Sequence, residues 1–276
     1  MKCGYLGPVG SYSYLALKES FPAYEPVSRD TFAEIIEQVE SGDLTAGFLP
    51  VENSTEGAVT SVMDSLLSLS RATILGETVY TVKHHLFSAV KEMESIDRVY
   101  SHPQALEQCR HFFRNQYPKI RLIPVESTSA ACVRAFHEGR GAGAVTSQWG
   151  GLHHGLLSVL ENIQDNRFNQ TRFVLLGEGN CQPTGDDKTA IAFSFHRDYA
   201  GSLYEVLKIF ADVSINLTRI ESRPAKMELG HYVFFIDFEG HQQDEVVKRV
   251  LEKLQLMTRR FHVFGSFPKA KGPVGS

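Results

Sequence analysis

Short apolar runs alternate with helical patterns over most of this 276-residue chain, and this alternation restricts the fold more than any other feature of the sequence. Residues 2–6 have the pattern of a strand and residues 11–21 that of a helix. Strand and helix patterns follow at 45–51 and 59–69, and the alternation continues to an apolar run at 173–176. Such an order predicts an α/β fold whose strands are connected by helices.

A different order begins after residues 177–187, which are rich in Gly and Asp and are typical of a linker. The patterns beyond it predict strands at 189–195, 215–220, 231–238 and 260–264, helices at 202–211 and 244–254, and a turn at 221–224. The order βαββαβ predicts a ferredoxin-like domain. Residues 268–276 are predicted to form a loose tail.

The composition excludes several classes of protein. The formal net charge of -4 offers no basic surface for nucleic acid. No apolar run is long enough for a membrane span or a signal peptide, so we expect a cytoplasmic protein without a membrane partner. The four cysteines show no Cys-x-x-Cys spacing, so we expect reduced thiols and no metal site.

Polar side chains cluster where predicted strands turn into helices, at residues 7–13, 50–57, 101–104 and 126–131. Thr171 and Arg172 add a fifth polar group at the start of the 173–176 run, where Arg172 could fork onto a carboxylate and Thr171 could donate a hydrogen bond. Taken singly, each group is typical of a helix cap or a strand start. Together they predict a site for a small, oxygen-rich anion at one edge of the sheet. The glycine spacing at 7–10 is not that of a dinucleotide-binding loop, so no nicotinamide cofactor is expected.

These segments, in their order along the chain, resemble the signatures of the prephenate dehydratase family: Gly7-Pro8-Val9-Gly10-Ser11-Tyr12-Ser13, Pro50 to Gly57, Ser101-His102-Pro103-Gln104, Ser127 to Ala131 and Asn169-x-Thr171-Arg172-Phe173. Two more, Gly201-Ser202-Leu203 and Glu221-Ser222-Arg223-Pro224, resemble motifs of the regulatory ACT domain. Tyr12 stands where Phe is common, and Ser202 stands where Ala is common and could alter effector affinity. No extra helical region of the kind seen in family members fused to chorismate mutase precedes these motifs, so the resemblance implies a stand-alone dehydratase.

The resemblance implies an α/β fold with two domains. Residues 1–180 would form a two-lobed catalytic domain like type II periplasmic binding proteins, and residues 188–267 a ferredoxin-like (βαββαβ) ACT regulatory domain, followed by the tail at 268–276. One lobe would hold about residues 1–77 and 169–180, and the other residues 78–168. The ligand would bind between the lobes.

The implied reaction is the loss of carbon dioxide and water from prephenate to give phenylpyruvate, a lyase step of phenylalanine biosynthesis. No cofactor is expected, because aromatisation of the ring drives the reaction. The family assigns the donor for the leaving ring hydroxyl to the threonine that matches Thr171. Since a threonine hydroxyl does not titrate near neutral pH, we interpret Thr171 as an oriented hydrogen-bond donor. The resemblance assigns catalytic roles to Thr171, Asn53, Ser101 and Gln108.

The same motifs imply a set of substrate-binding residues: Ser11, Ser13, Ser54, Thr55, Gln104, Thr128, Ser129, Ala130 and Arg172. Arg172 could neutralise a substrate carboxylate or brace its lobe. The implied effector is L-phenylalanine, bound at a paired ACT interface lined by Gly201, Ser202, Leu203, Asn216, Leu217, Glu221, Ser222, Arg223 and Pro224. Paired ACT domains imply a homo-dimer or a homo-tetramer.

Three other interpretations remain open at the level of sequence. A two-lobed solute-binding or amino-acid-sensing protein would share the fold without the chemistry. An arogenate dehydratase would differ only in the substrate, which carries an amine in place of the ketone. A catalytically silent regulator would keep the same residues without turnover.

Overall fold

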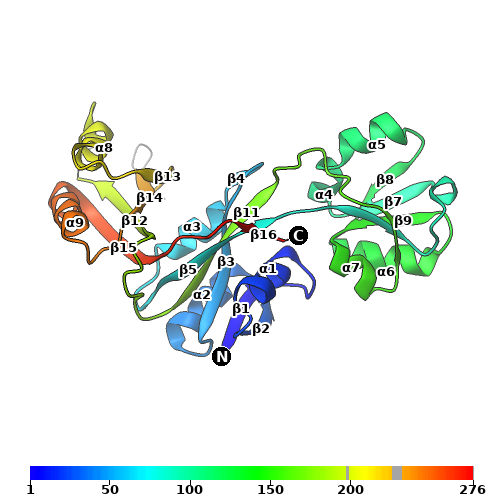
Figure 1. Cartoon of the computed structure of the whole chain (residues 1–276), viewed down its shortest axis with the longest axis horizontal. Coiled ribbons are helices and arrows are strands. Elements are labelled where there is room, and N and C mark those ends of the chain that lie inside the picture. The colour runs from blue at the N-terminus through cyan, green and yellow to red at the C-terminus, as the bar shows by residue number, and fades with distance from the viewer. Residues whose placement is uncertain (197–198, 226–231, 276) are drawn as a thin grey trace.

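The structure is a computed structural model that describes residues 1–196, 199–225 and 232–275. The predicted strand at 231–238 begins at His231, which lies outside the described residues; the observed strand β14 spans Tyr232–Glu239. Figure 1 shows three parts in a row: a carboxyl-terminal domain, a central lobe one and a distal lobe two. In the part of the chain that the structure describes, no helix is both long and apolar enough to cross a bilayer.

Lobe one is built on a mixed sheet with the strand order β16-β5-β11-β3-β1-β2, and β4 pairs with β3. β1 runs parallel to β2 and β3, whereas β11 runs antiparallel between β3 and β5. The elements are β1 (Lys2–Leu6), α1 (Tyr12–Ser20), β2 (Glu25–Arg29), α2 (Phe32–Ser41), β3 (Ala46–Asn53), β4 (Gly57–Ala58), α3 (Thr60–Leu66), β5 (Ala72–Thr81), β11 (Gln170–Glu178) and β16 (Pro273–Val274).

Two boundaries differ from the sequence-based expectation. Because β5 continues to Thr81, lobe one extends past residue 77. The predicted loose tail is wrong, because β16 pairs in parallel with β5. Val274 packs against the core beneath α1, and the Gly275 N–H donates to Glu19 Oε1 at 3.2 Å, so these last residues are held against lobe one.

Lobe two is built on a sheet with the order β10-β6-β9-β7-β8. Its elements are β6 (His85–Ser88), the 3-10 turn η1 (Met93–Ser95), β7 (Arg98–Ser101), α4 (Pro103–Glu107), α5 (Arg110–Gln116), β8 (Arg121–Pro124), α6 (Thr128–Glu138), β9 (Ala142–Thr146), α7 (Gln148–His153) and β10 (Leu157–Leu160). The chain passes between the lobes twice, from β5 to β6 and from β10 to β11. This two-connection arrangement confirms the predicted two-lobed architecture.

The carboxyl-terminal domain has the predicted βαββαβ order, with its four strands arranged β13-β14-β12-β15. Its elements are β12 (Asp187–Phe195), α8 (Ser202–Asp212), β13 (Leu217–Pro224), β14 (Tyr232–Glu239), α9 (Glu245–Met257) and β15 (Thr258–Pro268). The predicted turn at 221–224 is wrong, because these residues continue β13 in register with β14. One face of the sheet packs on α8 and α9, and the other faces lobe one.

The two junctions of lobe one differ in what they bury. A single apolar cluster joins lobe one to the carboxyl-terminal sheet, and it includes Ile74 and Leu176 from the former and Phe235 and Phe264 from the latter. At Gly265 of β15 an added Cβ would lie 2.8 Å from the Ile74 carbonyl oxygen, which shows how closely β15 and β5 approach. The apolar clusters of lobe two contain residues of lobe two alone.

Candidate active site

The predicted strand-to-helix junctions meet in one cavity of about 360 Å³ between lobe one and lobe two. Lobe one contributes the turn after β1, the last residue of β3 and the start of β11. Lobe two contributes the starts of α4 and α6. Residues of the two connections complete the wall. The lining residues are Gly7, Pro8, Ser11, Tyr12, Asn53, Val82, His84, His102, Gln104, Ala105, Gln108, Glu126, Ser127, Thr128, Asn169 and Thr171.

Thr171 and Asn53 are cross-strand partners at the ends of β11 and β3. Both side chains line the cavity, and Asn53 Nδ2 lies 2.9 Å from Thr171 Oγ1. Successive side chains of a strand point to opposite faces, so the neighbouring pair, Arg172 and Glu52, points away from the cavity. The register of two strands therefore brings together residues 118 positions apart in the chain.

Backbone amides determine which end of the Asn53 side chain faces Thr171. The N–H groups of Thr55 and Glu56 donate to Asn53 Oδ1 at 2.9 and 3.2 Å, so the atom facing Thr171 is the Nδ2 donor. Thr171 Oγ1 accepts this hydrogen bond, and its own proton has no acceptor among the described residues. The Thr171 hydroxyl is therefore oriented to donate into the cavity.

The same polarity continues along a chain of side chains into lobe two. Asn53 Nδ2 also donates to Asn169 Oδ1 at 3.0 Å, and Asn169 Nδ2 donates to Gln108 Oε1 at 2.7 Å. His84 Nε2 lies 2.7 Å from the same Gln108 oxygen and must donate to it. Two backbone amides in the turn between β3 and β4 thus determine the tautomer of a histidine in the connection between the lobes.

His84 is 2% exposed, and burial lowers its pKa to about 4, against the opposing effect of its hydrogen bond to Gln108. The ring is therefore neutral at pH 7, with its proton on Nε2 and an acceptor at Nδ1. The Tyr12 hydroxyl lies beside two acceptors, the Lys83 carbonyl oxygen at 2.6 Å and His84 Nδ1 at 3.0 Å. Its single proton can be donated to one of them at a time, and the carbonyl oxygen is the nearer. Burial raises the pKa of Tyr12, so it remains a phenol.

Helix N-termini supply the positive potential of the cavity. Ser11 caps α1 by accepting from Tyr14 N at 3.3 Å, and Ser127 caps α6 by accepting from Ala130 N at 3.0 Å. Among the described residues that line the cavity there is no Lys or Arg, and Glu126 is its single carboxylate. The arrangement can bind an anion through helix termini, hydroxyls and amides.

Six of the predicted site residues line the cavity: Ser11, Asn53, Gln104, Gln108, Thr128 and Thr171. Ser129 and Ala130 line an adjoining groove that shares Pro8, Glu126 and Ser127 with it. Ser13, Ser54 and Thr55 do not line it, and Ser54 Oγ instead donates to the Phe168 carbonyl oxygen at 2.8 Å, which ties the end of β3 to the segment before β11.

Two predicted residues take structural roles instead. Ser101 is fully buried, and its hydroxyl donates to the Val145 carbonyl oxygen at 2.6 Å, so it holds β7 to β9 and does not reach the cavity. Arg172 does not line the cavity either, and its ion pairs match the bracing role that the sequence left open as the alternative. Its Nε lies 2.6 Å from Glu77 Oε2 and its Nη1 pairs with Asp237 of the carboxyl-terminal domain. The alternation of side chains along β11 places Arg172 on the face opposite Thr171.

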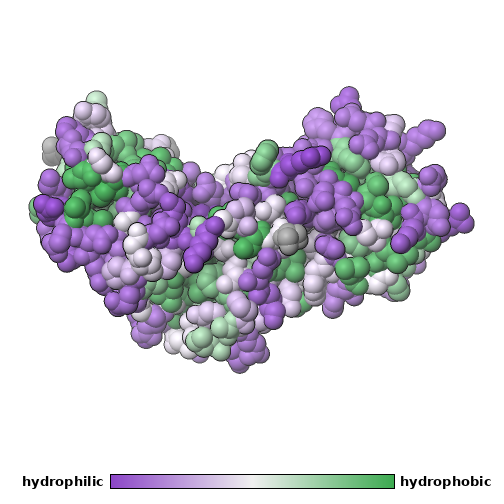
Figure 2. All heavy atoms as spheres, in the orientation of Figure 1, coloured by the Kyte–Doolittle hydropathy of each residue, from purple (hydrophilic) through white to green (hydrophobic). Residues whose placement is uncertain are grey.

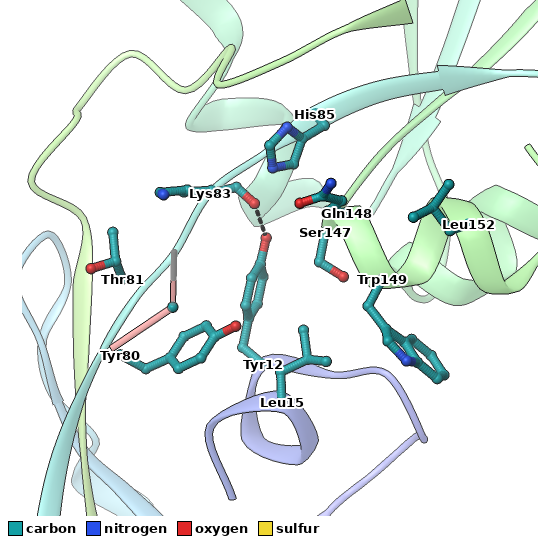
Figure 3. Close-up of a pocket in the computed structure, with 11 residues that line it drawn as sticks. Tyr12, Leu15, Tyr80, Thr81, Lys83, His85, Ser147, Gln148, Trp149 and Leu152 are labelled. Carbon is teal, nitrogen blue, oxygen red and sulfur yellow. Dashed lines mark hydrogen bonds between the residues drawn. The ribbon is translucent and has the colours of Figure 1, made fainter. Parts of the chain in front are cut away.

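Sequence reasoning missed His84 and Tyr12, and it gave no role to Asn169, which lay within a recognised motif. The signal for His84 was its position beside His85 between the apolar residues Val82 and Leu86, in a stretch whose one other polar residue is Lys83. Tyr12 separates the candidate active site from a second cavity of about 280 Å³ on its other side, which Trp149, Tyr80 and Leu152 also line. Figure 3 shows this second cavity and the hydrogen bond from Tyr12 to the Lys83 carbonyl.

The predicted effector residues fall into two groups within one chain. Ser202 lines a hollow of about 390 Å³ with Tyr199 and Glu205 at the start of α8, and Gly201 precedes that helix with a φ of 105°. The other group lies along β13, where Arg223 Nη2 pairs with Asp64 of α3 at 3.3 Å. Asn216 and Leu217 lie at the start of that strand, and the Asn216 carbonyl accepts from Glu239 N at 3.0 Å.

Comparison with known proteins covers nearly the whole chain. Residues 3–181 match the family described as prephenate dehydratase, and residues 191–255 match the ACT domain. The bifunctional chorismate mutase/prephenate dehydratase of Aquifex aeolicus is 40% identical over 98% of this chain and 74% of its own length.

Two solved structures share the fold over essentially the full chain. The prephenate dehydratase of Arthrobacter aurescens in complex with L-phenylalanine is 30% identical, with a TM-score of 0.89 over 99% of this chain and 92% of that one. A protein described as a novel type of quorum-quenching acylase is 26% identical, with a TM-score of 0.86 over 98% of this chain and 99% of that one.

Proposed function

The chain belongs to the prephenate dehydratase family and carries an ACT domain, and we propose that it removes carbon dioxide and water from prephenate to give phenylpyruvate, as a carbon-oxygen lyase. One observation carries the proposal beyond family membership. The amide of Asn53 donates to Thr171 Oγ1, so the Thr171 proton is left for a ligand in the cavity. An oriented neutral donor is what a leaving hydroxyl requires.

The proposed step begins with the ring hydroxyl of prephenate beside Thr171. As the ring carboxylate leaves as carbon dioxide, its bonding electrons enter the ring and the C–O bond to the hydroxyl breaks. Thr171 donates a hydrogen bond to the departing oxygen, and one proton taken up from the solvent converts the departing hydroxide into the water that is released. Asn53 strengthens this donor, because a hydroxyl that accepts a hydrogen bond is a better donor itself.

The substrate's two carboxylates are proposed to lie against the helix N-termini and the polar wall. Ser11 of the α1 cap and Thr128 in the first turn of α6 face the cavity from opposite lobes. Gln108 accepts from both Asn169 and His84 through Oε1, so its Nε2 is oriented to donate to the substrate. Desolvation of the ring carboxylate as the lobes close would favour its loss as neutral carbon dioxide.

L-phenylalanine is proposed as the effector at paired ACT domains, since the Arthrobacter relative was solved in complex with it. The carboxyl-terminal domain offers a surface for such pairing. β13 is an edge strand, and exposed Ile220, Tyr232 and Tyr204 lie on this domain, which is the left part of Figure 2. A homo-dimer or homo-tetramer formed through this surface, acting in the cytoplasm, completes the proposal.

The decisive experiment measures phenylpyruvate formed from prephenate by the wild type, Thr171→Ala and Thr171→Ser, with arogenate as the rival substrate. We expect turnover of prephenate, a loss of about 100-fold or more in kcat for Thr171→Ala, and substantial activity for Thr171→Ser, which keeps the hydroxyl. Turnover of arogenate alone would move the substrate assignment, and near-normal kcat in Thr171→Ala would exclude Thr171 as the donor.

The acylase similarity makes acyl hydrolysis the competing activity. The cavity offers it little chemistry, because Cys3, Cys109 and Cys132 are buried and burial raises the pKa of each thiol. Thr171 accepts from an amide and has no general base beside it among the described residues. Hydrolysis of an acylated quorum-sensing signal in the absence of prephenate turnover would favour this alternative.

A further inference from the structure

On the faces that point away from the cavity, β11 and β3 carry charged side chains that form ion pairs with the ACT domain. Arg172 pairs with Asp237 of β14, and Glu52 Oε2 lies 3.9 Å from Arg219 Nε of β13. Arg219 Nη1 lies 4.0 Å from the same Asp237 oxygen. Glu77 of β5 joins Arg172 at 2.6 Å to Lys188 of β12 at 2.8 Å. We name these three cations and three carboxylates the charge cluster.

The charge cluster lies directly behind the catalytic donor pair. Thr171 is followed by Arg172 on β11, and Asn53 is preceded by Glu52 on β3, so each donor residue is bonded through the main chain to a cluster member. The two cluster members are themselves cross-strand partners, as the two donor residues are. The register of β11 against β3 shifts between Arg172 and Phe173, which gives the strand a local irregularity at this point.

Burial makes this cluster sensitive to small displacements. The Glu77, Asp237 and Arg219 side chains are 0%, 6% and 9% exposed. Separating buried partners leaves uncompensated charge, so the strands that carry them tend to move together. The Glu52 side chain is 43% exposed, and its contact with Arg219 is correspondingly weaker.

We propose that Arg172 is a positioning residue that couples the ACT sheet to Thr171: a shift of β13 and β14 moves Asp237, Arg172 follows it, and the Thr171 hydroxyl is turned relative to the substrate. The inference rests on the proposed function and extends it, because it names the contact through which an effector bound at the ACT domain would change turnover. The Glu52–Arg219 contact acts on Asn53 in the same way, and more weakly.

The test compares Asp237→Asn with Asp64→Asn in the full chain. Both remove a carboxylate charge from an ion pair across the same junction, but the Asp64 pair with Arg223 is not connected to the donor pair by adjacent residues. Two quantities are measured for each: the dissociation constant of L-phenylalanine by calorimetry, and the factor by which saturating L-phenylalanine lowers kcat/KM for prephenate.

For Asp237→Asn we expect that factor to fall by about fivefold or more, with the dissociation constant within about twofold of wild type. Asp64→Asn should be inhibited like the wild type. Inhibition of Asp237→Asn equal to that of wild type would overturn the proposal, as would equal uncoupling by Asp64→Asn. If Asp237→Asn does not fold, Glu52→Gln replaces it, and full inhibition of that variant would count against the route through Asn53.

The wild-type measurements separate this inference from the function on which it rests. No turnover of prephenate would contradict the proposed reaction. Turnover that L-phenylalanine does not alter would leave the reaction standing and overturn both the proposed regulation and the coupling through Arg172.

Discussion

Lobe one meets its two neighbours in opposite ways. Toward lobe two it presents a cavity, two chain connections and a chain of amide, imidazole and hydroxyl groups from Asn53 to Tyr12. Toward the ACT sheet it shares an apolar core and the buried charge cluster. Hydrogen bonds between lobe one and lobe two can break and re-form at little net cost. Separating lobe one from the ACT sheet would instead expose apolar surface and buried charge. The lobes can therefore open and close while the ACT sheet stays attached to lobe one.

The largest effect is expected from truncating a buried phenylalanine, which tests whether lobe one and the ACT sheet share one apolar core. Phe235 at the ACT junction and Phe113 in lobe two are each 2% exposed, so they form a matched pair. Truncation of either to Ala should cost about 3–5 kcal/mol in the free energy of unfolding. Hydrogen exchange should then rise in both lobe one and the ACT domain for Phe235→Ala, and in lobe two alone for Phe113→Ala. If exchange rises only in the ACT domain for Phe235→Ala, lobe one and the ACT domain do not unfold as one core.

Lowering the pH should reduce the stability contributed by the lobe–lobe junction and by the ACT junction in different pH ranges. His84 titrates near pH 6.5 when unfolded and near 4 when folded, so between these values the unfolded chain binds the extra proton. The stability due to neutral His84 is complete above pH 6.5 and is lost as the pH falls, by on the order of 3 kcal/mol at pH 4. Urea unfolding as a function of pH should show this slope in the wild type, and His84→Gln should lack it.

Glu77 provides the contrast at the ACT junction. Burial alone would raise its pKa, but Arg172 and Lys188 outweigh burial and hold the pKa of this carboxyl below its usual value of 4.5. Its contribution is therefore complete above pH 4.5 and is lost below it. Glu77→Gln should leave the slope between pH 6.5 and 4.5 unchanged, and a flattened slope in that interval would contradict the assignment to His84.

The smallest expected effect concerns a contact between the lobes. Gln104 Nε2 of lobe two donates to Glu56 Oε1 of lobe one at the edge of the cavity. Removing one exposed hydrogen bond that favours closure should weaken substrate binding by about 1 kcal/mol or less. Glu56→Ala should raise KM about threefold with kcat within about twofold of wild type, and Glu56→Gln, which keeps an acceptor, should match the wild type. A large fall in kcat for Glu56→Ala would place Glu56 in the chemistry itself.

The sequence was sufficient where local rules decide the structure. The polar groups at two of the predicted strand-to-helix junctions do supply helix caps, Ser11 and Ser127, and the βαββαβ order of the second domain is confirmed. It failed where long-range pairing decides. Nothing local indicates that Ser101 donates to a carbonyl 44 residues away, or that β13 continues through the predicted turn to pair with β14.

Arg172 shows why the candidate site could be predicted only in part. Arg172 and Thr171 are adjacent in sequence, and both side chains are suited to bind an anion. Their residue types alone therefore predicted the same ligand for both. The strand period of two sends them to opposite faces, and that period becomes informative only once the pocket-facing side of the sheet is known. His84 posed the reverse problem, because a buried polar residue takes its role from partners that the sequence does not identify.

The alternation along β11 also constrains how the gene can change. Substitutions near Thr171 can be absorbed one side chain at a time, but loss or gain of one residue between Asn169 and Phe173 would exchange the faces of the strand. A guanidinium would then enter the cavity and a hydroxyl would replace the partner of Asp237. Related sequences should therefore accept insertions and deletions in the loop before residue 169 far more readily than within the three residues that follow it.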